Sequence, residues 1–175
     1  MFTRNLILGL LIVWVGQASA EQAGPMLGKP VSESLVKQWN QDVFPDGEGL
    51  PAGSGTAAQG KLVYQQYCQS CHGVDGSGGS ADELAGAKHG LTDNPPDKTI
   101  GTYWPYATTL FDFNRRAMPL NAPGSLSNDQ LYAVTAYLLY LNGIINEQEA
   151  MNAQILAKVV MPNRNGFIDE SGVKQ

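Results

Sequence analysis

The stretch Cys68-Gln69-Ser70-Cys71-His72 decides how the rest of the chain is interpreted, and it contains both cysteines of the sequence. C-x-x-C-H is the attachment pattern of c-type haem. Two thiols on one helical turn can form thioethers with the two vinyl groups of a haem, and the histidine that follows can ligate the iron. The pattern therefore predicts one covalent haem c, attached through Cys68 and Cys71, with His72 as an axial ligand.

Two other uses of a cysteine pair fit the sequence less well. A thioredoxin-like dithiol lies between a strand and a helix, and no strand is predicted directly before Cys68. A structural zinc site needs four ligands, and the chain has no second pair of cysteines. Haem attachment also accounts for the number of cysteines, because both thiols would become thioethers and no free cysteine would remain.

The second axial ligand of an electron-transfer haem is expected to be methionine or histidine. Met118 lies in Arg-Arg-Ala-Met-Pro, between helix-breaking prolines, and Pro119 would stiffen a ligand loop at this point because its ring fixes φ. We predict that Met118 is this ligand. The alternatives are Met161, which repeats the Met-Pro pattern, and His89 in a polar loop, whereas Met151 is expected on the surface of a helix.

A capping box at residues 56–59, Thr-Ala-Ala-Gln, predicts the start of a helix that runs to about Ser70 and carries the cysteine pair. Gly60 lies inside this helix, where glycine costs about 1 kcal/mol relative to alanine. We therefore expect a second helix to approach closely at Gly60. Tyr137 is expected to lie across this glycine, with Tyr64 alongside.

A second capping box, at residues 127–130, predicts a helix over residues 128–142, and Gly143 predicts its end. Residues 106–116, directly after a proline, are predicted to form another helix. The helix at 128–142 has an apolar stripe at helical spacing, formed by Leu131, Val134, Leu138 and Leu141.

Four further residues are candidates for contacting a haem propionate. Tyr103 and Trp104 combine an aromatic body with a polar group that can reach a carboxylate. Arg115 and Arg116 can pair with a carboxylate or supply charge for docking a partner. The alternatives are packing in the core for the aromatic residues and a solvated face for the arginines.

The N-terminus has the pattern of a secretion signal: Arg4, an apolar run over residues 6–15, and the cleavage pattern Ala-Ser-Ala at 18–20. The run is shorter than the roughly 20 residues that a membrane span needs, so we expect cleavage before Glu21, a periplasmic location and no membrane span. The formal net charge of −5 argues against nucleic-acid binding, which needs a basic surface.

These features divide the chain into four predicted parts: a signal peptide (1–20), an N-terminal arm (21–55), a haem domain (56–145) and a C-terminal extension (146–175). Short helices are expected around 32–39 and within 146–158, and the end of the chain from Met161 is expected to be extended and polar. Ordering such arms costs conformational entropy, so we expect them to wrap around the domain or a partner.

The C-x-x-C-H motif, Arg-Arg-Ala-Met-Pro and the terminal helix together resemble class I cytochromes c. Three further segments resemble more narrowly the SoxD family, the cytochrome c subunits of the molybdenum-containing sulfite/sulfane dehydrogenase of bacterial sulfur oxidation. They are GLPAGSGTAAQG (49–60), YWPYATTLFD (103–112) and MPNRNGF (161–167). The resemblance covers roughly residues 39–167, and YWPYATTL is its most discriminating part.

The resemblance implies an all-α, class I cytochrome c fold, with three to five helices around one haem and extended arms at both ends. It also implies that Cys68 and Cys71 hold the haem and that His72 and Met118 ligate the iron. The implied partners are a SoxC-like subunit with the molybdenum cofactor and a downstream periplasmic cytochrome. SoxD proteins commonly carry two haem domains, whereas this chain has one motif, so the sulfur substrate of the partner stays open.

The function expected from the sequence is therefore electron transfer by a subunit that has no catalytic residues of its own. A free mobile electron carrier is the alternative within the same class. A haem enzyme that acts on a sulfur compound would need an open iron site or a cysteine ligand, and no cysteine remains after attachment. A haem-based sensor is a further alternative, although no sensor partner domain is recognisable in the sequence.

Overall fold

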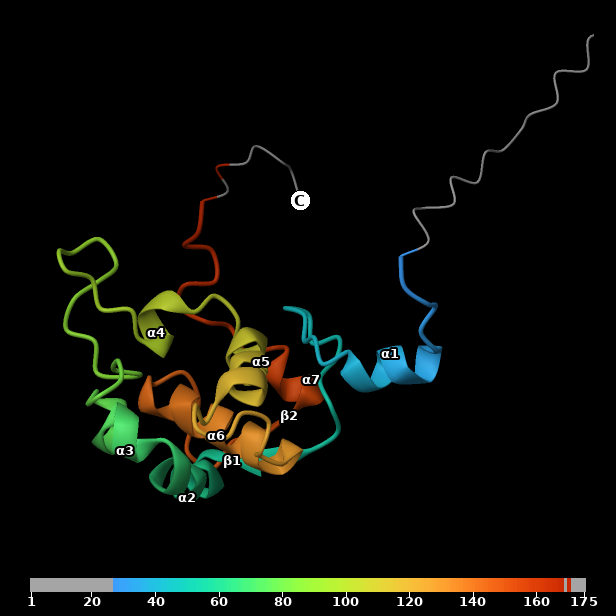
Figure 1. The fold of residues 1–175 in the computed structure, drawn as a ribbon. Helices are drawn as coiled ribbons and strands as arrows, with labels where there is room; N and C mark the ends of the chain where they lie inside the picture. Colours follow the sequence, from blue (N-terminus) through green and yellow to red (C-terminus); the bar gives the residue numbers. More distant parts are fainter. Residues whose placement is uncertain (1–26, 169, 171–175) are drawn as a thin grey trace, which may run out of the picture. The chain divides into compact units, whose positions relative to one another are not determined.

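A computed structural model describes residues 27–168 and residue 170 (Figure 1). The predicted signal peptide lies outside the described residues. The chain divides into two compact units, one ending at Gln38 and the other beginning at Trp39. The described part of the first unit contains helix α1 (Glu33–Trp39), which extends one residue into the second and has no buried side chain. The expected short helix around residues 32–39 is thereby confirmed.

Most of the regular secondary structure in the second unit is helical, and its helices lie close to the predicted positions. Its elements are β1 (Ser54–Thr56), α2 (Ala57–Tyr67), α3 (Gln69–His72), a 3₁₀ turn (Val74–Gly76), α4 (Ile100–Tyr103), α5 (Ala107–Ala117), α6 (Asn128–Leu141), β2 (Ala150–Asn152) and α7 (Ala153–Leu156). The predictions for α2, α5 and α6 are confirmed to within a few residues. The four-residue helix α4 and the two strands were not predicted.

Helix α2 begins at the predicted capping box. The Thr56 hydroxyl accepts the N–H of Gln59, and the Gln59 side chain accepts the N–H of Thr56. These two bonds satisfy backbone donors that a helix N-terminus leaves unpaired. The helix ends at Tyr67, and the motif continues through Cys68 into α3.

Helix α6 is the central element of the second unit, and residues 131–139 along it are all buried. Ser127 and Gln130 form the predicted capping box at its start. At its end Gly143 has φ +69°, a left-handed conformation in which glycine is unstrained, and its N–H donates to the Tyr140 carbonyl. The stop signal at Gly143 is therefore confirmed.

Replacing Ser127 by alanine should lower the free energy of unfolding by about 1 kcal/mol, because the first turn of α6 loses a capping bond. Chemical denaturation followed by circular dichroism measures this change. Replacing Ser125, an exposed serine two residues earlier, should change stability by no more than about 0.5 kcal/mol. An equal effect of both substitutions would show that the cap is not the cause.

Helices α2 and α6 cross at Gly60, as the sequence predicts. A Cβ atom added to Gly60 would overlap the main-chain carbonyl of Ala133 and would lie 2.8 Å from the Cβ of Tyr137. The rings of Tyr64 and Tyr137 pack against each other beside this crossing, with 5.3 Å between their centroids. The absent side chain is therefore what allows the two backbones to come this close.

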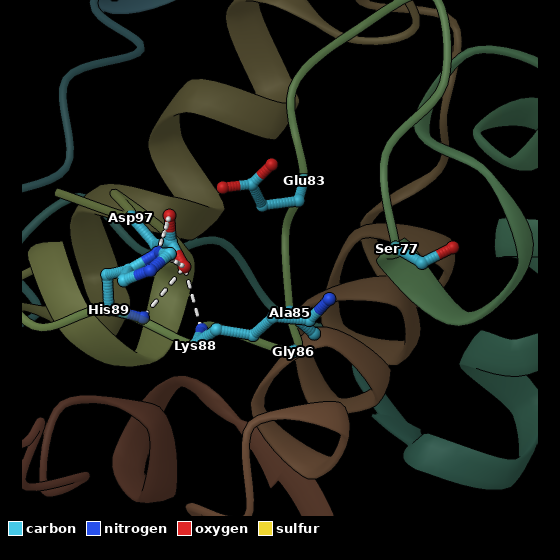
Figure 2. A pocket seen from close by; sticks show the side chains of 7 residues that line it. All are labelled: Ser77, Glu83, Ala85, Gly86, Lys88, His89 and Asp97. Atoms are coloured by element: carbon cyan, nitrogen blue, oxygen red, sulfur yellow. Dashed lines mark hydrogen bonds and ion pairs between the residues drawn. The ribbon is translucent and has the colours of Figure 1, made fainter. Parts of the chain in front are cut away.

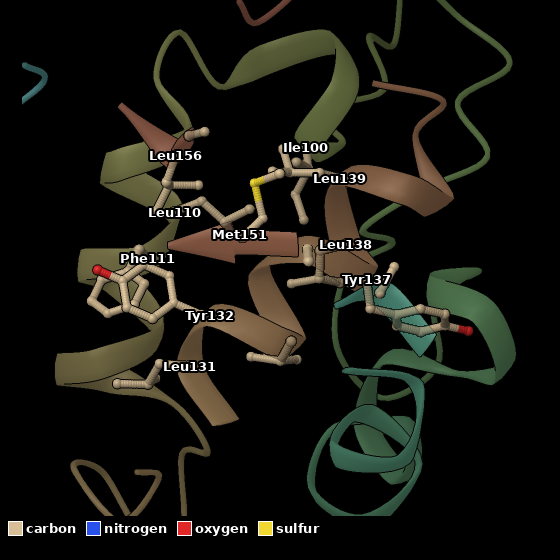
Figure 3. Packing of buried hydrophobic residues seen from close by; sticks show 14 of the residues in the cluster. Ile100, Leu110, Phe111, Leu131, Tyr132, Tyr137, Leu138, Leu139, Met151 and Leu156 are labelled. Carbon is tan, nitrogen blue, oxygen red and sulfur yellow. The ribbon is translucent and has the colours of Figure 1, made fainter. Parts of the chain in front are cut away.

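The core lies between α5, α6 and the segment that follows α6 (Figure 3). Phe111 of α5 and Tyr132 of α6 pack with 4.6 Å between their ring centroids. Two residues expected elsewhere are also buried here. Met151 lies on strand β2 and not on a helix surface, and Met161 is buried although the end of the chain was expected to be polar.

Strand β2 also corrects the expectation of a helix within residues 146–158, of which only α7 is helical. It pairs antiparallel with β1, and Gly55 lies opposite Met151. The pairing partner lies almost a hundred residues earlier in the chain, so the local sequence pattern carries no signal of it.

The part of the predicted N-terminal arm that lies in the second unit packs against the helices. The Tyr132 hydroxyl donates to the Pro51 carbonyl at 2.8 Å, and the side chains of Val43 and Leu50 contact the core. This part of the arm therefore follows the domain surface, as expected for a wrapping segment.

Candidate haem-binding site

The two cysteine side chains lie one helical turn apart at the junction of α2 and α3. The N–H of Cys71 donates to the Cys68 carbonyl at 3.1 Å, which places both side chains in the same turn. Cys68 is half-buried and Cys71 is exposed, and the two are not joined by a disulfide. Burial, followed by the neighbouring Cys71, raises the pKa of the Cys68 thiol to about 11. A thioredoxin-like dithiol lies between a strand and a helix, whereas this pair directly follows helix α2, so the arrangement does not fit a thioredoxin-like site.

His72 is the last residue of α3, and its ring is held by a main-chain acceptor. Its Nδ1 lies 2.8 Å from the carbonyl oxygen of Asp82. A carbonyl oxygen can only accept, so Nδ1–H donates, and in the neutral imidazole Nε2 then carries the lone pair. A ring held through one nitrogen, with the other free, is the arrangement of a histidine that binds a metal.

The segment that carries Asp82 is joined to the cysteine motif by main-chain hydrogen bonds. The N–H of Gly78 donates to the His72 carbonyl at 2.8 Å, and the N–H of Ala81 donates to the Cys71 carbonyl at 3.0 Å. These bonds tie the segment that carries Asp82 to the main chain of the cysteine motif, beside the imidazole.

Met118 is the C-terminal cap of α5. Its N–H donates to the Asn114 carbonyl at 3.2 Å, its backbone is extended, and its side chain is half-buried. Asn114 is 8% exposed, and its Nδ2 has no hydrogen-bond partner among the described residues. Helix α5 therefore ends at the predicted ligand, as the prolines around it indicate.

The residues present fit a haem by the chemistry of their donors and by the apolar side chains beside them. The motif supplies two thiols and one free imidazole nitrogen, and α5 supplies a thioether sulfur. Two large apolar side chains, each two residues after a predicted ligand, face solvent: Val74 is 62% exposed and Leu120 is 80% exposed. Exposed apolar side chains beside the predicted ligands suit contact with the apolar ring of a haem.

The two arginines contact protein groups. Arg116 pairs with Asp112 one turn earlier on α5 and lies 3.6 Å from the Asp42 carboxylate. Arg115 donates to the Gln41 carbonyl at 3.3 Å. Both side chains therefore join α5 to residues 41–42 of the same unit. Contact of either arginine with a haem propionate stays a prediction.

Tyr103 and Trp104 pack with other aromatic rings. The ring of Tyr103 lies edge-on to that of Phe167, with 5.5 Å between centroids, and the ring of Trp104 lies 5.7 Å from that of Phe113. Asn163 donates to the Tyr103 carbonyl at 2.8 Å. These contacts agree with the packing alternative, and the propionate role again stays a prediction.

His89 lines a pocket of about 310 Å³ in the loop before α4 (Figure 2). The Asp97 carboxylate accepts the main-chain N–H groups of Lys88 and His89, and these bonds lower the pKa of Asp97. The His89 ring lies 3.4 Å from the same carboxylate. The pocket is lined by Ser77, Glu83, Ala85, Gly86, Lys88, His89 and Asp97. Within the described residues no three His, Cys, Asp or Glu side chains cluster as a metal site.

Comparison with known proteins identifies the family of the chain. The cytochrome c family model matches residues 57–142. The chain is similar to the sulfane dehydrogenase SoxCD from Paracoccus pantotrophus in its crystal structure. The two are 40% identical with a TM-score of 0.78, over 84% of this chain and 73% of that chain. The chain belongs to the cytochrome c family. A comparison with curated proteins finds no match.

As a cytochrome c, the chain carries covalent haem c and transfers electrons. The resemblance to SoxD and the class I cytochrome c fold, both predicted from the sequence, are confirmed. Helices α2 to α6 lie within the region that the family model matches. In the described part of this cytochrome, no helix is long and apolar enough to cross a membrane.

Proposed function

We propose that this cytochrome is a periplasmic, monohaem electron-transfer subunit that accepts electrons from a SoxC-like molybdenum sulfane dehydrogenase. The observation that carries the electron-transfer role is the His72 imidazole, whose Nδ1–H is bound to the Asp82 carbonyl while Nε2 is free to ligate. The observation that carries the partner is the 40% identity to SoxCD over most of both chains.

In this proposal each site residue has one task. Cys68 and Cys71 would form the thioethers that hold the haem, and His72 and Met118 would ligate its iron. When bound, the haem iron supplies one-electron exchange between its ferric and ferrous states. With both residues bound to the iron, no coordination position would remain for a substrate. In this proposal the subunit would carry electrons, and the partner would perform the sulfur chemistry.

The other candidate ligands have different surroundings. Met161 is 1% exposed and packs in the core, where methionine commonly fills irregular space. His89 is exposed and lies beside Asp97 in its own loop. Met118 is half-buried at the end of a helix, so its sulfur can turn toward a haem without opening the core.

The periplasmic location and the electron acceptor are part of the same proposal. The secretion-signal pattern at residues 1–20 supports export, and haem attachment through cysteine thioethers leaves no thiol to oxidise there. Electrons accepted from the molybdenum subunit would then leave to another periplasmic cytochrome.

Purification from the native host tests the partner. We expect a tagged form of this cytochrome to elute with a molybdenum-containing subunit, and the complex to reduce the haem when sulfite or thiosulfate is added. A double Cys68→Ala, Cys71→Ala variant should give no haem reduction in the same assay. Elution of the haem-loaded cytochrome alone, without sulfur-dependent reduction, would favour the free mobile carrier and contradict the subunit proposal.

A further inference from the structure

A buried tyrosine of α6 holds the loop that follows the haem motif. The Tyr137 hydroxyl donates to the Asp75 carboxylate at 2.7 Å, and Tyr137 is only 3% exposed. Hydrogen bonds to an ionised acceptor are stronger than neutral ones. Burial, and then this hydrogen bond, raise the pKa of Tyr137 far above its usual value, so the hydroxyl keeps its proton.

A second residue, Asn142 at the C-terminal end of α6, holds this loop farther along the chain. The Asn142 side chain donates to the Leu84 carbonyl at 3.0 Å and to the Leu138 carbonyl at 2.8 Å, and it accepts the N–H of Gly101 at 3.0 Å. The segment from Asp75 to Leu84 is thus fixed to α6 at both of its ends.

The acceptor of the His72 ring lies inside this segment. Asp82 presents its carbonyl to Nδ1 of His72, and the two ends of the segment are tied together by the N–H of Leu84, which donates to the Gly76 carbonyl at 2.7 Å. The segment is therefore a short closed loop, and a shift of either anchor moves the carbonyl that orients the imidazole.

We infer that Tyr137 and Asn142 are positioning residues for the axial histidine, because they hold the Asp82 carbonyl against Nδ1–H of His72. This inference rests on the proposed ligation of the iron by His72. It adds two residues that influence how strongly the His72 imidazole binds. A donor bond from Nδ1 makes the imidazole a more basic ligand, which favours the ferric state. Loosening the anchors should weaken this bond, speed exchange of the Nδ1 proton and raise the midpoint potential.

Two variants remove the same hydrogen bond from opposite ends in the haem-loaded protein. Tyr137→Phe removes the donor. Asp75→Gly removes the acceptor without backbone strain, because Asp75 has φ +53° and glycine accepts that conformation. We expect both to accelerate solvent exchange of the His72 Nδ1 proton about three- to tenfold, the range for loss of one hydrogen bond, and to raise the potential. Asp75→Asn keeps an acceptor oxygen but loses the charge, so its exchange rate and potential should lie between those of the wild type and of Asp75→Gly.

Two controls separate this effect from general loosening. Tyr140→Phe removes a hydroxyl from an exposed position on the same helix, and Glu83→Ala removes a carboxylate from the same loop. Neither should change proton exchange or potential. If Tyr137→Phe fails to fold, Asp75→Gly decides the matter alone, because Asp75 is exposed.

The outcomes distinguish this inference from the proposed function. Unchanged exchange and potential in Asp75→Gly, with a wild-type spectrum of a histidine-ligated haem, would overturn the positioning role and leave the ligand assignment intact. Equal changes in Tyr140→Phe or Glu83→Ala would also overturn it. A wild-type NMR spectrum without an iron-bound imidazole would instead contradict His72 as a ligand, and with it the proposed function.

Discussion

Replacing Met118 by leucine should lower the midpoint potential of the haem by roughly 0.2 V, a fraction of the ~0.8 V over which axial ligands move haem potentials. The reason is that a thioether sulfur stabilises ferrous iron and raises the potential. Potentiometric titration of the purified haem-loaded protein measures the shift.

Met161→Leu is the matched control, because it makes the same change in the other Met-Pro pair. Met161 is buried in the core, where exchange of methionine for leucine keeps nearly the same volume and costs less than about 1.5 kcal/mol. Its potential should equal that of the wild type. A drop in potential on Met161→Leu, with none on Met118→Leu, would move the ligand assignment to Met161.

Carbon monoxide gives a second test of the same position. Met118→Ala should leave the sixth coordination position open, so the reduced variant should bind carbon monoxide, whereas the reduced wild type should not. Absorption spectra before and after addition of the gas measure this. Carbon monoxide binding by the native protein would instead favour a haem enzyme with an open iron site.

Gly60→Ala should lower the free energy of unfolding by about 2–3 kcal/mol, although alanine favours a helix by about 1 kcal/mol. The added methyl would overlap the Ala133 carbonyl at the crossing of α2 and α6. The obstacle is main chain, so no side-chain rotation relieves it and the helices must separate. Denaturation of the haem-loaded protein measures the loss.

Lys61→Ala is the control for this substitution, because it changes the next residue of α2 at an exposed position. It should change stability by no more than about 0.5 kcal/mol. A Gly60→Ala protein as stable as the wild type would mean that the close approach of the two helices is not needed for the fold.

The sequence predicted those features of the fold whose signals are local. Thr56 and Ser127 begin helices because each caps one together with a glutamine three residues later. Gly60 indicated the helix crossing because an unfavourable residue inside a helix needs a compensating contact. The attachment motif is equally local, and its residues lie in one turn of α3 and its cap.

The features that were missed depend on partners far away in the chain. Strands β1 and β2 have three residues each and pair across most of the domain, so neither shows a period of its own. Met151 is buried only because that pairing exists. The acceptor of the His72 ring is a main-chain carbonyl, which any residue type at position 82 would supply, so composition carries no signal of it.

The bond between Tyr137 and Asp75 joins positions 62 residues apart. The sequence correctly predicts Tyr137 at the helix crossing but indicates a role only for its ring. Packing alone explains an aromatic residue at a buried helix position. Its hydroxyl needs a partner once it is buried, and that requirement is the signal that could have led to Asp75.

Intact mass together with a pyridine haemochrome spectrum tests the central claim most directly. The protein is expressed in a host with cytochrome c maturation. We expect the processed chain plus the mass of one haem, the spectrum of a haem held by two thioethers, and loss of covalent attachment in the Cys68→Ala, Cys71→Ala variant. A protein of bare polypeptide mass, with Cys68 and Cys71 free or joined to each other, would contradict the haem site and every ligand assignment that depends on it.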